Sequence, residues 1–154
     1  MEAVALYDVE DAKEAENIIE RILPRLQHNN PAVILAAVKC ILRSTDLIAE
    51  SLKATVVKKL AAPLVTLLSC EPEIQYISLR NINFVLKKEP SIFEHSSKVF
   101  YCKFNDPLYL KLEKIEILVK VCQEATSEAI LTELQDYSND MDMDLVQAAV
   151  KAVG

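Results

Sequence analysis

The stretch that decides the fold reads Ile74-Gln-Tyr-Ile-Ser-Leu-Arg-Asn-Ile82. Related stretches begin 41 residues earlier and 36 and 71 residues later, at Val33–Ile41, Leu110–Leu118 and Leu145–Val153. The first, sixth and ninth positions are apolar in all four copies. The fifth is small in three copies, but the Leu110 copy has Lys114 there. Because positions one, five and nine are four residues apart, they share one helix face. The sequence therefore predicts four related amphipathic helices.

Start signals support these four helices. The pairs Asn30-Pro31, Glu71-Pro72 and Asp106-Pro107 precede the first three copies, and an aspartate of the run 140–144 is available to cap the fourth. Asparagine and aspartate side chains cap free amide groups, and proline at the first helical position loses no hydrogen bond. The remaining patterns predict further helices over 10–27, 52–68, 91–100 and 126–138.

Paired helices that recur every 35 to 41 residues are typical of HEAT and armadillo repeats. We therefore expect an all-α fold, a right-handed α-solenoid of HEAT/armadillo-type helix pairs. Residues 1–154 would form a single solenoid fragment of about three and a half pairs.

Composition excludes several other classes of protein. The 154 residues include one glycine, Gly154, so no glycine-rich loop exists to bind phosphates or a dinucleotide. No Asn-Gly or Asp-Gly turn is present to close hairpins. Apolar residues make up 51%, which is enough for a packed core. No apolar run reaches the roughly 18 residues of a membrane helix, and no signal peptide is visible at the N-terminus.

The four cysteines, Cys40, Cys70, Cys102 and Cys122, are too widely spaced to suggest zinc ligands. We expect reduced thiols that serve as small core side chains.

No pattern predicts catalysis, a metal site or a cofactor. No local pattern suggests that His28 or His95 lies beside a cysteine in space, as a Cys–His nucleophile would require. His28 ends a predicted helix, where a surface or capping role is expected. The run Asn139–Asp144 resembles the opening of a calcium loop but lacks the glycine and glutamate that such a loop requires. Its aspartates are better explained as helix N-terminal acids.

Charge is distributed unevenly along the chain. The net charge of −6 combines −6 over residues 1–20, +2 over 21–50, +4 over 51–120 and −6 over 121–154. This profile is a weak indication of a partner surface in the middle of the chain, and ordinary solvated helix faces explain it as well. Nucleic acid is not an expected partner, because the chain is acidic and no basic cluster alternates with aromatic residues.

Two polar residues, Arg80 and Asn81, interrupt an otherwise apolar helix. One interpretation is an armadillo-type peptide-binding groove of the nuclear-import kind, in which asparagine binds extended backbone. Such grooves pair asparagine with tryptophan, which this chain lacks. The favoured interpretation for Asn81 is a hydrogen bond between repeats.

Five long stretches resemble one known family, the β-adaptins, which are the β large subunits of heterotetrameric clathrin adaptors. They are residues 20–28, 58–69, 71–83, 98–115 and 144–154. Because the stretches follow in register from about Leu6 to Gly154, the resemblance covers nearly the whole chain.

The resemblance implies a central piece of the adaptor trunk, a solenoid that embraces the medium chain beside a second large chain and a small chain. It implies a structural scaffold in vesicle-mediated protein transport rather than an enzyme. The expected location is cytoplasmic, on clathrin-coated vesicles at the Golgi, endosomes or the plasma membrane, with only peripheral membrane contact. Clathrin binding would belong to regions outside this fragment. The resemblance assigns no catalytic residue, and the partner-binding residues are unknown at this stage.

Overall fold

The structure is a computed structural model that describes residues 11–154, apart from the side chains of Glu94 and His95. The chain divides into two compact units, Met1–Ser69 and Cys70–Gly154. Each unit is built from helices packed through apolar faces.

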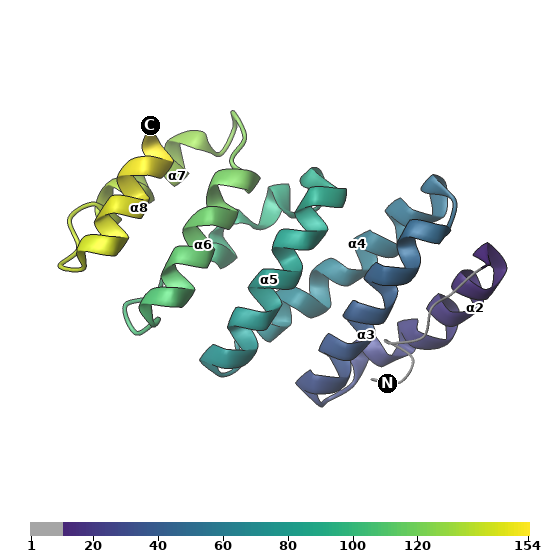
Figure 1. The fold of residues 1–154 in the computed structure, drawn as a ribbon. Coiled ribbons are helices and arrows are strands. Elements are labelled where there is room, and N and C mark those ends of the chain that lie inside the picture. The colour runs from purple at the N-terminus through teal and green to yellow at the C-terminus, as the bar shows by residue number, and fades with distance from the viewer. Residues whose placement is uncertain (1–10) are drawn as a thin grey trace. The chain divides into compact units, whose positions relative to one another are not determined.

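The first unit is centred on α3. Its described elements are α2 (Ala12–Ile22), the 3-10 helix η1 (Leu23–Gln27), α3 (Pro31–Ser44), the 3-10 turn η2 (Thr45–Leu47) and α4 (Glu50–Leu67). Helix α3 packs against α2, η1, η2 and α4 (Figure 1). The core contains Ile19, Val38, Ile41 and Leu60, none more than 2% exposed. The predicted helix 10–27 thus forms as an α-helix that tightens into a 3-10 helix around Pro24.

The second unit is built around three neighbouring helices, α5, α6 and α8. Its elements are α5 (Pro72–Lys88), the 3-10 segment η3 (Pro90–Phe100), α6 (Leu108–Val121), α7 (Ser127–Tyr137) and α8 (Met143–Val153). Helices α5, α6 and α8 lie side by side, since α6 packs against both of the others (Figure 1). The segment η3 packs on α5 and α6, while α7 packs on α8. The rings of Phe93 and Phe100 meet edge to face at 5.6 Å within η3.

The all-α prediction is confirmed, since residues 11–154 contain helices and connecting turns without any strand. The four related stretches lie in α3, α5, α6 and α8, and the four intervening helices form close to their predicted bounds. The fold is an α-solenoid of HEAT/armadillo-type helix pairs.

The repeat register predicts which side chains are buried. Ile41, Ile82 and Leu118 at the ninth position are fully buried, whereas Val153 in the last copy is 45% exposed. At the fifth position Ala37, Ser78 and Ala149 are fully buried. Lys114 occupies the same position and is only 1% exposed, so the polar exception in this column is a buried charge.

Two of the three expected caps form. The Asn30 side chain accepts a hydrogen bond from the Ala32 amide at 2.9 Å, and Asp142 accepts from the amides of Asp144 and Leu145. The expectation for Asp106 is wrong, because Pro107 is the N-cap of α6 and has no side-chain cap bond. The Asp106 carboxylate instead accepts from the Lys103 amide at 2.8 Å and pairs with buried Lys114. An unpaired buried ammonium costs more free energy than an uncapped, exposed helix end, so the Asp106 carboxylate pairs with Lys114.

Among the described helices, none is both long enough and apolar enough to cross a bilayer.

Candidate functional site: the α5–α6 face

A polar ladder joins α5 to α6. The Glu113 carboxylate accepts from the Arg80 guanidinium at 3.1 Å and from the Asn83 side-chain Nδ2 at 3.3 Å. The Lys120 ammonium donates to the Asn83 side-chain Oδ1 at 2.6 Å and to Glu116. The hydrogen bond from Lys120 holds the pKa of Glu116 below its ordinary value. Because Asn83 is only 7% exposed, its two bonds are shielded from water and fix the two helices in register.

Apolar and aromatic side chains stand beside this ladder. Ile77, Phe84 and Tyr109 are 46%, 47% and 43% exposed. Ile77, Arg80 and Phe84 are three and four residues apart, so they form one stripe along α5. The ring of Tyr109 on α6 meets that of Tyr76 on α5 edge to face at 5.6 Å.

We call the set Ile77, Arg80, Phe84, Tyr109 and Glu116 the α5–α6 face. Phe84 also lies under the ammonium of Lys88, which is 5.3 Å from the ring centroid. Half-exposed aromatic residues beside an arginine are the composition that protein–protein interfaces enrich. The ladder holds this surface in place before any partner arrives, which lowers the ordering cost of binding.

The predicted role of Asn81 is wrong. Its side-chain Nδ2 donates to the Ile77 carbonyl oxygen at 2.8 Å within the same helix. The bonds between repeats are made by Arg80, which was a candidate from the sequence, and by Asn83, which was not. A signal for Asn83 did exist, because the preceding and following copies have Leu42 and Val119 at that position. A polar residue at a repeat position that is apolar in the neighbouring copies indicates a hydrogen bond between helices.

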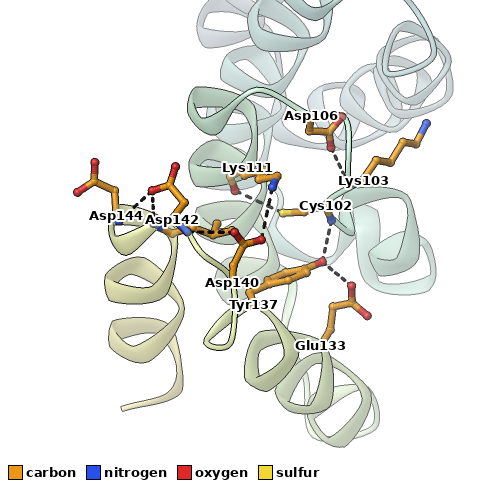
Figure 2. Close-up of polar contacts among 10 residues, drawn as sticks. Cys102, Lys103, Asp106, Lys111, Glu133, Tyr137, Asp140, Asp142 and Asp144 are labelled. Carbon is orange, nitrogen blue, oxygen red and sulfur yellow. Dashed lines mark hydrogen bonds and ion pairs between the residues drawn. The ribbon is translucent and has the colours of Figure 1, made fainter.

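A second polar cluster joins the loop before α6 to α7 and to the loop before α8. Figure 2 shows the Tyr137 hydroxyl between the Cys102 amide, from which it accepts at 2.7 Å, and Glu133, to which it donates. Lys111 pairs with Asp140 at 3.6 Å. Burial and the bond to Glu133 raise the pKa of Tyr137. Burial raises the pKa of the Cys102 thiol to about 11, so this thiol is not activated as a nucleophile.

All four cysteines are free, but their surroundings differ. Cys40 is buried, and Cys70 and Cys102 are partly buried. The core role expected for Cys122 is wrong: it is exposed, because it directly follows the last residue of α6.

His28 has the expected surface position, but its Nδ1 accepts from the Asn30 amide at 3.0 Å rather than donating to a helix carbonyl. The side chain of His95 lies outside the described residues. In the aspartate run, Asp140 and Asp142 accept backbone amides around the start of α8, as expected of N-terminal acids. Across the described part of the chain, no three His, Cys, Asp or Glu side chains are placed to hold a metal ion.

Comparison with known proteins identifies the family. Residues 3–154 match the family described as the adaptin N terminal region. The chain is 46% identical over its whole length to the AP-1 complex subunit beta-1 of Homo sapiens and 44% identical to the AP-1 complex subunit beta of Dictyostelium discoideum. It is 39% identical to the AP-2 complex subunit beta of Schizosaccharomyces pombe. The matched region spans 16% of the human and Dictyostelium proteins and 23% of the yeast protein. The chain therefore belongs to the adaptin N-terminal region family, and its sequence matches the N-terminal trunk region of the β-adaptins.

Proposed function

We propose that the chain is a scaffold portion of the β subunit of a clathrin-associated adaptor complex. The observation that carries this proposal is the match of the whole chain, at 44–46% identity, to β subunits of AP-1 complexes. The role is structural, in vesicle-mediated protein transport, and involves no catalysis.

The partners in this proposal are the other adaptor subunits: the medium chain, the second large chain and the small chain. Residues 1–154 would form one continuous fragment of the larger trunk, with clathrin bound by regions outside it. The complex would be cytoplasmic and would lie on coated membranes as a peripheral layer.

The α5–α6 face is the proposed contact for the medium chain. Phe84 and Tyr109 offer half-exposed aromatic surface, and Arg80 and Glu116 offer hydrogen-bonding groups at its margin. This combination would let a partner bury apolar surface against the aromatic rings, while hydrogen bonds to the charged groups orient it. The competing role, a nuclear-import peptide groove, gains no support, since the Asn81 amide is engaged within its own helix.

The test is capture of the medium chain's N-terminal domain by the immobilised chain. We expect the parent to capture it and Phe84→Asp to lose most of the binding, because the variant places a charge in apolar contact surface. Val99→Asp on η3 is the matched control, because Val99 is 38% exposed and lies outside the face. Failure of the parent would overturn the scaffold role. Equal capture by parent and Phe84→Asp would overturn only the assignment of the face.

A further inference from the structure

The loops that precede α6 and α8, with the first residue of α8, carry the most exposed apolar side chains of the described residues. Phe104 is 96% exposed, Met141 101% and Met143 77%. No other large apolar side chain within residues 11–154 is more than 57% exposed. We call these three residues the loop edge. Large apolar side chains that are exposed to this extent are candidates for contact with a partner.

The two loops are adjacent and firmly held. Lys111 in the first turn of α6 pairs with Asp140 of the later loop, and the Tyr137 hydroxyl holds the Cys102 amide of the earlier one (Figure 2). Asp106 closes the earlier loop by accepting from the Lys103 amide. The loop edge is therefore displayed on an anchored backbone.

The two methionines flank Asp142, whose backbone is extended, with φ −86° and ψ 112°. The Asp142 carboxylate accepts from the Asp144 and Leu145 amides, so it is turned toward the start of α8. Met141 and Met143 therefore lie exposed on either side of an aspartate that the backbone holds in place.

The charge around this pair is strongly negative. Asp140, Asp142 and Asp144 alternate with the methionines, and residues 121–154 carry seven acidic residues against one basic residue. Lys111 pairs with Asp140. Within the described residues no ion pair involves Asp142 or Asp144. A surface of this sign repels anionic lipid and attracts a basic protein segment.

We propose that the loop edge binds a basic, apolar segment of another protein, in which hydrophobic side chains alternate with lysine or arginine. The partner's apolar side chains cover Met141, Met143 and Phe104, while its cations face the aspartates. Methionine suits such a contact because its unbranched side chain adapts to different apolar shapes. The proposal rests on the loop edge alone and does not depend on the scaffold role.

The test uses labelled ten-residue peptides and fluorescence anisotropy with the full chain. The probe alternates lysine and leucine, and the comparison peptides alternate glutamate with leucine or lysine with serine. We expect the lysine–leucine peptide to bind about tenfold or more tightly than either comparison peptide. We also expect its affinity to fall several-fold between about 0.05 M and 0.5 M salt, because salt screens the attraction between the aspartates and the lysines of the peptide.

Variants assign the binding to the loop edge. The double variant Met141→Ser, Met143→Ser should bind the probe peptide about tenfold more weakly than the parent, since two apolar contacts are lost. Asp144→Asn should weaken it by about threefold at low salt only. Leu52→Ser on α4 and Glu124→Gln are the matched controls and should bind like the parent, because Leu52 is 39% exposed and both residues lie outside the loop edge. Circular dichroism should show that all the variants remain folded.

Three results would overturn the proposal. The first is equal binding of the lysine–leucine and glutamate–leucine peptides. The second is parent-like binding by the methionine double variant. The third is binding to phosphatidylserine vesicles that displaces the probe, which would make the loop edge a membrane contact. Loss of medium-chain capture alongside normal probe binding would count against the scaffold role alone.

Discussion

Lys114 and Asp106 form an ion pair in which the lysine side chain is 2% exposed and the aspartate side chain 7%. Lys114 occupies a position of the repeat that otherwise holds alanine or serine, and Asp106 lies in the loop before α6. Asp106 also accepts from the Lys103 amide. The pair therefore connects the body of α6 to the loop before it, and removing one partner leaves a buried charge without compensation.

Lys114→Ala should lower the free energy of unfolding by about 3–5 kcal/mol, because the Asp106 carboxylate would stay buried and unpaired. The double variant Lys114→Met, Asp106→Asn should recover most of this loss, since it removes both charges and keeps an acceptor for the Lys103 amide. Urea unfolding of the parent, the single variant and the double variant measures the difference. A double variant no more stable than Lys114→Ala would contradict this account.

Ile82→Asp should destabilise the chain severely or prevent folding. Ile82 is fully buried, and the loss of a packed aliphatic group alone costs about 2–5 kcal/mol, to which the burial of a charge adds. Lys87→Asp on the same helix changes charge by more, but Lys87 is exposed, so its melting temperature should stay close to that of the parent. Thermal melts of both variants decide the matter, and similar melting temperatures would show that the repeat register is wrong.

Stability should fall between pH 9 and pH 11. The folded state holds the Cys102 proton up to a pKa of about 11, whereas the ordinary value is 9.0. Because the pKa is raised in the folded state, the contribution of the protonated Cys102 thiol to the free energy of unfolding is fully present below pH 9. This contribution is lost as the pH rises toward 11. The expected loss is about 2 kcal/mol. Urea midpoints across this range measure it, and Cys102→Ala should show a smaller fall than the parent.

Thiol labelling at pH 8 should modify Cys122 first. Cys122 is exposed, whereas Cys40 is buried and burial raises the pKa of its thiol. The Cys102 thiol is also protonated at this pH, because its pKa is about 11. Mass spectrometry after brief treatment with a maleimide would identify the modified residue. Cys122→Ser should remove the fast phase, and fast labelling of Cys40 in that variant would contradict the burial.

Sequence periodicity predicted the helices because burial in a solenoid depends on position along each helix. The recurrence of Ile41, Ile82 and Leu118 carries that information directly, and all three residues are fully buried. Local capping was predicted with equal success at Asn30, whose partner is two residues away.

Long-range polar partners were less predictable. Glu113 meets Arg80 across 33 residues and Asn83 across 30, and no local rule specifies such a pairing. Asp106 has the sequence context of a cap, yet a lysine eight residues later takes its carboxylate. The useful signal is an exception in a repeat column, as Lys114 and Asn83 illustrate. The loop edge could not be predicted from periodicity, because the repeat pattern describes positions on the helices and not on the loops.

The bond from the Cys102 amide to the Tyr137 hydroxyl, which spans 35 residues, has a consequence for synthesis on the ribosome. At about 5–20 residues per second, Tyr137 leaves the ribosome roughly 2–7 s after Cys102. During that interval the Cys102 amide can donate a hydrogen bond only to water. The loop before α6 therefore lacks the contact with Tyr137 that holds it in the folded chain. The growing chain thus completes this contact only after α7 has emerged, so nascent chains that stall within α7 should be a target for chaperones.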